Sequence, residues 1–180
     1  MHLTSKVYGE ERRQQILQLL RTSPVPLTGS GLAKKMNVSR QVIVQDISLL
    51  KAKSEPIMAT SQGYIYMHSH APSKNAERLI ACVHTPEQTA EEMRVIVDHG
   101  AAVKDVMVEH PVYGDLTASI MVHNRKEVEE FIEKITSSQS FYLSQLTEGV
   151  HMHTIAADSE SVLDDVCQAL DDKGFLIKDE

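Results

Sequence analysis

Two histidines stand one residue apart in the segment GVHMHTI, residues 149–155. In an extended chain, residues i and i+2 share a face, so the imidazoles of His151 and His153 point to one side and Met152 points to the other. Neutral imidazoles presented in this way are common metal ligands. Two ligands rarely complete a metal site, so further donors are expected from other parts of the chain.

Two further candidate ligands lie earlier in the chain. His84 stands where the apolar segment RLIACVH meets the segment TPEQTAEEMRVIVDHG, and Glu92 lies about two helical turns beyond Thr85. Imidazole and carboxylate donors together suit Zn, Ni, Fe or Mn, and the donor types alone do not select one of these metals. The alternative is a group of polar residues on an exposed sheet edge, because a chain with nine histidines often contains a close pair by chance.

The charge of the chain is unevenly distributed. The formal net charge is -7, yet residues 1–70 carry nine Lys and Arg residues against four acidic residues, which gives +5. The remaining nine basic and 21 acidic residues give -12 for residues 71–180. We therefore predict two domains, 1–70 and 71–180, and a polyanion as the partner of the first domain.

The composition also predicts the compartment. The sequence contains no apolar run of about 18 residues that could span a bilayer, and its first residues lack the apolar segment of a secretory signal. The two cysteines, Cys82 and Cys167, are too few for a disulfide framework and are expected to be buried, reduced thiols. We expect a cytoplasmic protein that makes no contact with a membrane.

The first domain is predicted to contain three helices followed by a hairpin. An apolar stripe of helical period runs through GEERRQQILQLLRTS, Thr28 can cap a second helix, GSGLAKKMN, and Ser39 can cap a third, RQVIVQDISLLKAK. Two short apolar runs in PIMATSQGYIYM, around a Ser-Gln-Gly turn, predict a two-stranded wing. This order of elements is that of a winged helix-turn-helix, in which the second helix of the motif enters the major groove.

Six residues of this motif are candidate contacts to DNA: Lys34, Lys35, Ser39, Arg40, Gln41 and Gln45. Arg40 and Gln41 have the chemistry to read guanine and adenine, respectively. The two lysines are expected to contact phosphates and to supply affinity without sequence information. The alternative is a three-helix scaffold whose basic residues are only solvated, since helix-turn-helix spacing alone has many false positives.

In the second domain, strand-like and helix-like segments alternate. Strands are expected in RLIACVH, AVKDVMVEH, DLTASIMVH, FYLSQL and VHMHTIAA, and FLIK is expected to close the sheet. Helices are expected in TPEQTAEEMRVIVDHG, NRKEVEEFIEKITSS and DSESVLDDVCQALDDKG. The predicted fold class is therefore α+β, with an N-terminal winged helix-turn-helix followed by an α/β sandwich on a mostly antiparallel sheet.

Both parts of the chain resemble known families. Residues 8–67 are similar to the winged helix-turn-helix of the HTH_11 type, except that the pair Ser54-Glu55 stands where a glycine-containing turn is expected before the wing. Residues 76–178 resemble a 3H (three-histidine) domain in VHTPEQTAEEMRVIVDHG, VEHPVYGDL and LTEGVHMHTI. The combination resembles the family of niacin-responsive transcriptional repressors from end to end.

This resemblance implies a site and a function. It implies a repressor, and not an enzyme, of the genes for NAD biosynthesis and niacin uptake, which binds operator DNA as a homodimer with nicotinic acid as corepressor. Glu91 is a neighbour that could substitute for Glu92, and His110 is expected near the effector or behind a metal ligand, with a turn-stabilising role as the alternative. The implied ligands of a divalent metal are His84, Glu92, His151 and His153.

Two other functions could use the same residues. In a metal-sensing repressor the ion itself is the signal, and the sequence does not separate this function from a response to nicotinic acid. A metal-dependent hydrolase is the second alternative, because three histidines and a glutamate around an unsaturated metal also resemble hydrolase chemistry. No separate general base or nucleophile is apparent beside the candidate ligands, which disfavours the enzyme.

Overall fold

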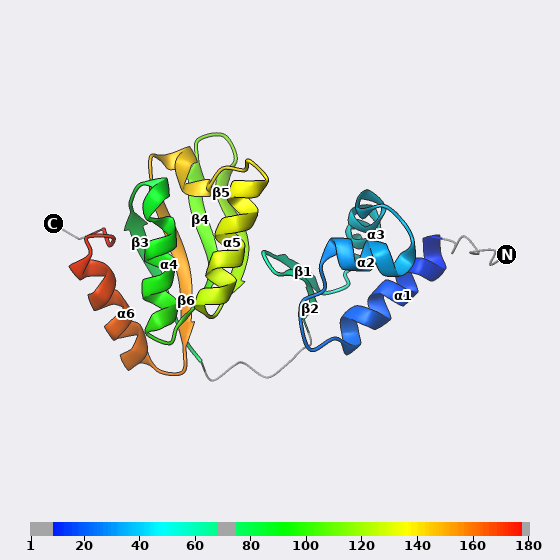
Figure 1. Cartoon of the computed structure of the whole chain (residues 1–180), viewed down its shortest axis with the longest axis horizontal. Coiled ribbons are helices and arrows are strands. Elements are labelled where there is room, and N and C mark those ends of the chain that lie inside the picture. The colour runs from blue at the N-terminus through cyan, green and yellow to red at the C-terminus, as the bar shows by residue number, and fades with distance from the viewer. Residues whose placement is uncertain (1–8, 68–74, 178–180) are drawn as a thin grey trace. The chain divides into compact units, whose positions relative to one another are not determined.

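The helices and strands of the chain fall into two units, residues 1–71 and 72–180 (Figure 1). The computed structural model describes residues 9–67 and 75–177, so the predicted domain boundary at residue 70 lies outside the described residues. The N-terminal unit holds three helices and a hairpin, and the C-terminal unit holds a four-stranded antiparallel sheet with helices. The predicted fold class, a winged helix-turn-helix followed by an α/β sandwich, is confirmed.

Three helices form the scaffold of the N-terminal unit: α1 (Gly9–Thr22), α2 (Gly29–Met36) and α3 (Arg40–Ala52). Both predicted caps are confirmed, because the side chain of Thr28 accepts a hydrogen bond from the N–H of Gly31 and that of Ser39 accepts one from Val42. Asn37 ends α2 in the left-handed conformation, with φ 53°. The apolar faces of the helices meet in a core of Ile16, Leu17, Leu20, Leu32, Ile43, Ile47 and Leu50.

The wing is a hairpin of strands β1 (Ile57–Thr60) and β2 (Gly63–Tyr66). A further segment joins it, because Leu27 and Tyr64 exchange both backbone hydrogen bonds, at 2.9 and 2.8 Å. A Cβ at Gly63, where φ is 134°, would lie 2.7 Å from the carbonyl group of Leu27, so this close approach requires glycine. Ser54 stands where the resemblance led us to expect glycine, and it adopts φ 64°, a conformation that L side chains rarely take.

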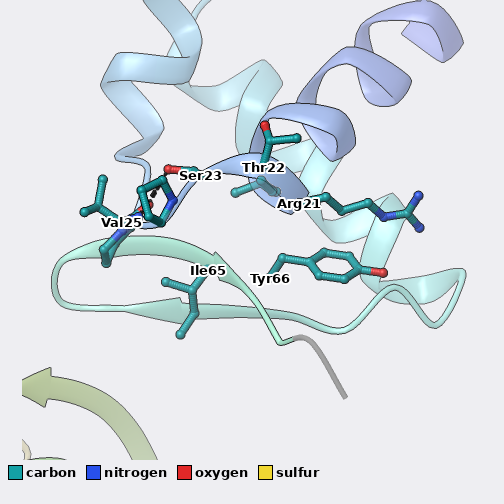
Figure 2. Close-up of a pocket in the computed structure, with 9 residues that line it drawn as sticks. Arg21, Thr22, Ser23, Val25, Ile65 and Tyr66 are labelled. Carbon is teal, nitrogen blue, oxygen red and sulfur yellow. Dashed lines mark hydrogen bonds between the residues drawn. The ribbon is translucent and has the colours of Figure 1, made fainter. Parts of the chain in front are cut away.

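A pocket of about 390 Å³ lies between the end of α1, the turn at residues 23–26 and strand β2 (Figure 2). On one wall the guanidinium of Arg21 lies over the ring of Tyr66, 5.1 Å from its centroid, and also forms an ion pair with Glu55 at 3.1 Å. The hydroxyl of Ser23 donates to the carbonyl of Val25 at 2.7 Å and holds the turn. The lining contains none of the predicted DNA-binding or metal-binding residues.

A buried ion-pair cluster connects α1 to α3. Asp46, on the inner side of α3, is only 2% exposed. Its carboxylate accepts hydrogen bonds from Nε of Arg12 at 2.6 Å and from Nη1 of Arg13 at 3.3 Å. Arg13 also donates to Glu10 at 2.6 Å. These two arginines therefore belong to the scaffold that positions α3.

The sheet of the C-terminal unit has the strand order β3-β6-β4-β5, and all its pairs are antiparallel (Figure 1). Its strands are β3 (Ala76–Val83), β4 (Ala102–His110), β5 (Gly114–Val122) and β6 (Val150–Ala157). The predicted strands AVKDVMVEH and DLTASIMVH form an antiparallel hairpin, in which His110 lies opposite Gly114. Strand β6, the last along the chain, lies between β3 and β4, which places the two-histidine segment inside the sheet.

Three helices cover one face of this sheet: α4 (Thr89–Asp98), α5 (Arg125–Ser137) and α6 (Glu160–Asp172) (Figure 1). A 3-10 turn, η1 (Pro86–Gln88), precedes α4, and Thr85 is its N-cap, so the α-helix itself begins at Thr89. The backbone N–H of Thr85 donates to Oε1 of Gln88 at 3.0 Å and closes this turn. The core between the layers includes Ile80, Met93, Ile96, Val103, Ile120, Val122, Ile155 and Leu163.

The predicted strand FYLSQL is wrong. Its residues form the 3-10 helix η2 (Leu143–Thr147) and the turn before it, and the ring of Tyr142 lies 6.5 Å from that of Phe131 on α5. Tyr142 therefore packs beside α5, whereas Phe141 and Leu146 are exposed, and the segment does not pair in a sheet. The described part of FLIK is not a full strand either, because Leu176 forms only an isolated bridge with Cys82 at the outer edge of β3.

We predict that Asp46→Asn destabilises the N-terminal unit by about 3 kcal/mol, because the largely buried guanidinium groups of Arg12 and Arg13 lose the charge of their shared buried carboxylate. Denaturant unfolding of the full chain, followed at the transition of this unit, measures the change. Glu11→Gln is the matched control, since Glu11 is exposed on α1 and forms no ion pair within the described residues. Equal stability of the two variants would contradict the structural role of the cluster.

Candidate functional site

Strand register brings the two histidine segments together. In the antiparallel pair β3–β6, Cys82 lies opposite His151 and Ile80 lies opposite His153. His84 follows Cys82 by two residues, at the end of β3, so it continues the same face of the sheet. This face is covered by α4, which carries Glu92. The four predicted metal ligands, distant in the sequence, therefore meet between the sheet and α4.

The carboxylate of Glu92 lies where three imidazoles converge. Its Oε2 is 2.7 Å from Nε2 of His84 and 3.3 Å from Nε2 of both His151 and His153. The rings stand nearly perpendicular to one another, with 81° between His84 and His151 and 83° between His151 and His153. Glu92 is 0% exposed and the three histidines are at most 8% exposed, so bulk water does not solvate this group of charges.

Each histidine uses its other ring nitrogen on a backbone carbonyl. A carbonyl oxygen can only accept, so each Nδ1 carries the hydrogen. In a neutral ring Nε2 then holds a lone pair, which faces a carboxylate that also only accepts. Two groups that only accept hydrogen bonds can face each other if the rings are protonated or if a cation is bound between them. A hydrogen bond from the second ring nitrogen to a carbonyl group is also what orients histidines around metals in proteins. The carbonyl partners are Thr85 for His84, Gly149 for His151 and Asp105 for His153.

The pKa shifts within the cluster have one electrostatic cause. Burial raises the pKa of Glu92, but the charge of His153 and the hydrogen bonds from all three rings outweigh it and hold the pKa well below its usual value. Burial lowers the pKa of His84 and of His153, yet the hydrogen bond and the charge of Glu92 raise both above the usual value. The site therefore holds an ionised carboxylate and attracts positive charge.

A fifth donor is Cys82, which the sequence predicted only as a buried thiol and not as a ligand. Its Sγ, a carboxylate oxygen of Glu92 and a ring nitrogen of His151 lie within 4.8 Å of one another and could hold a metal ion. Burial and the charge of Glu92 raise the pKa of the Cys82 thiol, so it is protonated while no cation is bound. The spacing Cys82-x-His84 repeats that of the two later histidines and is the signal that could have revealed it.

Two backbone features hold the histidines in place. Gly149 has φ 95°, and a Cβ there would collide with the backbone carbonyl of His84, so the chain can pass this close only as glycine. The β4–β6 register shifts between Val103 and Met107, which indicates a bulge. Within it Asp105 turns its carbonyl to His153, and its carboxylate accepts the backbone N–H of Thr154 at 2.9 Å.

The neighbouring residues Glu91 and His110 lie in different surroundings. Glu91 is exposed and forms an ion pair with Lys173 at 2.6 Å, whereas Glu92 is buried among the histidines. Nδ1 of His110 accepts hydrogen bonds from the backbone N–H groups of Val112 and Tyr113, at 3.2 and 3.3 Å. In the described residues no hydrogen bond or ring contact joins His110 to the cluster, so its effector role stays a prediction.

The predicted DNA-binding residues are all exposed and lie on α2, on α3 or at the cap between them: Lys34, Lys35, Ser39, Arg40, Gln41 and Gln45. Ser39 also caps α3. Within the described residues, Lys34, Lys35 and Arg40 form no ion pair, in contrast to Arg12 and Arg13. The positive charge that remains available to phosphates is therefore concentrated on the helix-turn-helix.

Comparison with known proteins agrees with this architecture. Residues 12–65 match the model of the HTH domain and residues 77–179 match that of the 3H domain. The chain is 62% identical over 175 residues to transcription repressor NadR of Bacillus subtilis (strain 168), with 97% of each chain covered. It is 38% identical over 179 residues to the probable transcription repressor NiaR of Thermotoga maritima, with 99% of each chain covered. The chain belongs to the family of 3H-domain transcription repressors.

Membership of the 3H-domain repressors decides between enzyme and regulator. The two relatives are transcription repressors and not enzymes, so the expectation that the chain is not an enzyme is confirmed. The HTH domain of this family implies DNA binding. In residues 9–67 and 75–177, no helix has both the length and the hydropathy needed to cross a membrane.

We predict that Gly149→Ala weakens the binding of Zn²⁺ by the full chain about 10–100-fold, because the added Cβ displaces the backbones that carry His84 and His151. Competition with a chromophoric chelator measures the affinity. Gly114→Ala is the matched control, since Gly114 also has a positive φ, 71°, but a Cβ there meets nothing within 4 Å. Unchanged Zn²⁺ affinity in Gly149→Ala would show that the position of this backbone does not matter to the site.

Proposed function

We propose that the protein represses genes of NAD biosynthesis and niacin uptake, and that it binds operator DNA with nicotinic acid as corepressor through a metal-containing 3H domain. The observation that carries this proposal is the convergence of three imidazole Nε2 atoms on the buried carboxylate of Glu92, in a chain that also has an HTH domain. A permanently buried group of this kind is poorly suited to a purely structural role, since apolar residues of similar volume would be at least as stabilising.

The residues fit a divalent transition metal. His84, Glu92, His151 and His153 would hold Zn, Ni, Fe or Mn, and the thiol of Cys82 is a further donor beside them. Once bound, the metal supplies a Lewis-acidic position for the carboxylate or the pyridine nitrogen of nicotinic acid. The backbone carbonyls that accept from Nδ1 keep every Nε2 turned toward this position.

Repression requires the effector to favour the DNA-binding arrangement. A ligand shifts an equilibrium only by its difference in affinity between two states, so nicotinic acid must bind better to the arrangement that fits DNA. A homodimer provides such an arrangement, because two helix-turn-helix motifs then read half-sites about 34 Å apart, or a multiple of that distance, in a palindromic operator. His110 is the proposed effector contact outside the metal cluster, in addition to its hydrogen bonds within the β4–β5 turn.

The operator response can be tested directly. The full chain, loaded with one equivalent of Zn²⁺, is titrated onto a promoter fragment of the niacin-uptake genes from the same organism, with and without nicotinic acid. We expect nicotinic acid to raise the operator affinity at least about fivefold, in the range of typical coupling free energies. Nicotinamide, which lacks the carboxylate, serves as the matched control ligand. Equal affinity with and without nicotinic acid would defeat the corepressor claim.

A metal titration at fixed nicotinic acid separates this function from a metal sensor. If nicotinic acid is the corepressor, the protein with Zn²⁺ alone has low operator affinity, and the addition of nicotinic acid raises that affinity. For the metal sensor, Zn²⁺ alone produces the full increase and nicotinic acid adds nothing. Because the metal and the effector are varied independently, each result supports one function and excludes the other.

The DNA contacts give a separate prediction. Lys35→Ala should weaken binding to all sequences and lower the slope of log affinity against log salt by about one, because one phosphate contact is lost. Arg40→Ala should weaken the operator more than random DNA, by about 1–3 kcal/mol of discrimination. Fluorescence anisotropy at several salt concentrations measures both quantities. Lys126→Ala, on α5 of the C-terminal unit, is the control that leaves the salt slope unchanged.

A further inference from the structure

One buried hydroxyl group of the C-terminal unit has no hydrogen-bond partner among the described residues. It belongs to Thr89, the first residue of α4, which is 8% exposed and whose Oγ1 is closed to solvent. Burial of a hydroxyl without a partner is unfavourable, and a valine would fill the same volume without that cost. A polar atom left in this way indicates a partner that is not yet in place.

The acceptor that a helical threonine normally uses is already occupied at this position. Thr22 and Thr136, on other helices, donate their hydroxyls to the carbonyl group four residues earlier, each at 2.9 Å. The carbonyl four residues before Thr89 is that of Thr85, which accepts a backbone N–H at 3.0 Å and Nδ1 of His84 at 2.8 Å. A carbonyl oxygen has two lone pairs, so both are used. The hydroxyl of Thr89 must therefore find its acceptor elsewhere.

Thr89 lies on the same side of α4 as Glu92. Both belong to the buried face of this helix, together with Met93 and Ile96. Residues three apart in a helix are neighbours, with about 5–6 Å between their Cβ atoms. Helical side chains lean toward the N-terminus, so the side chain of Glu92 extends over the turn that begins with Thr89. The carboxylate of the metal cluster is thus the neighbouring acceptor on this face.

The hydrogen-bond donors of Glu92 change when a cation is bound. In the metal-free protein, protonated imidazoles donate to its carboxylate, at 2.7 Å from His84 and 3.3 Å from His151. A ring that ligates a cation through Nε2 has no hydrogen on that atom and stops donating. Glu92 is 0% exposed, so water does not replace these donors. A carboxylate that ligates a metal is normally held by a hydrogen bond from a neighbouring group, and this one then lacks such a bond.

Two groups beside Glu92 can supply a hydrogen. The thiol of Cys82 lies within 4.8 Å of a carboxylate oxygen, but a thiol that ligates the metal has lost its hydrogen. The hydroxyl of Thr89 does not ionise and has no competing partner among the described residues. We propose that Thr89 donates a hydrogen bond to the non-ligating oxygen of Glu92 in the metal-loaded protein and is a positioning residue for this ligand. The inference rests on the proposed function, in which the cluster holds a metal.

The test follows two effects of one substitution in the full chain. Thr89→Val keeps the shape of the side chain and removes the hydroxyl. It should weaken Zn²⁺ binding about 10–100-fold, as measured by competition with a chromophoric chelator, because the ligand loses the group that orients it. In the metal-free protein, the denaturation midpoint of the same variant should equal or exceed that of wild type, since an unpartnered polar atom is removed. A purely structural role of Thr89 predicts a lower midpoint.

Two further variants isolate the oxygen atom. Thr89→Ser retains the hydroxyl and should restore most of the Zn²⁺ affinity. Thr136→Val is the matched control, because it makes the same chemical change at an exposed position of α5 and should leave Zn²⁺ affinity unchanged. If the valine variant does not fold, Thr89→Ala takes its place, and its comparison with Thr89→Ser again differs by one oxygen atom.

Two outcomes would overturn the role of this hydroxyl: Zn²⁺ affinity in Thr89→Val equal to that of wild type, or affinity in Thr89→Ser as low as in Thr89→Val. A wild type that binds no Zn²⁺ would refute both this proposal and the metal-containing site of the proposed function. The experiment contains neither DNA nor nicotinic acid. A protein whose operator binding ignores nicotinic acid would therefore refute only the proposed corepressor.

Discussion

The C-terminal unit is organised around one buried negative charge, the carboxylate of Glu92. An ionised group with no exposed surface is strongly unfavourable unless opposite charge or hydrogen-bond donors surround it. The three histidines that do so come from the end of β3 and from β6, so these strands must be neighbours although more than sixty residues separate His84 from His151. The pairing of β6 with β3 satisfies this requirement.

The N-terminal unit uses a buried carboxylate in a different way. Asp46 on α3 is compensated by Arg12 and Arg13, whose guanidinium groups stay charged at every physiological pH, so the recognition helix is held permanently. Glu92 is compensated by imidazoles, a side chain that can bind either a proton or a metal through its Nε2 atom. Asp46, on α3 of the helix-turn-helix, thus has permanently charged partners. The partners of Glu92, in the unit proposed to bind the effector, can change between protonated, neutral and metal-bound forms.

Expectations from local chemistry were mostly correct. The caps at Thr28 and Ser39 and the hairpin around the Ser-Gln-Gly turn depend on a few adjacent residues, and the structure contains all of them. The segment FYLSQL was misread because its apolar residues alternate like those of a strand, whereas Tyr142 packs against α5. Cys82 was overlooked as a donor because the Cys82-x-His84 spacing indicates only a shared face, while the place of Cys82 opposite His151 depends on strand register.

The sequence by itself determined the periodic elements, the unequal charge of the two parts and the donor types, because these are properties of neighbouring residues. Only the tertiary structure decided that Glu92 faces the cluster while Glu91 faces Lys173, since the rotation of α4 about its axis is set by packing on the sheet. It also decided that β6 lies between β3 and β4, because strand order depends on which apolar faces and charges can be buried together, and that is a property of the whole folded unit.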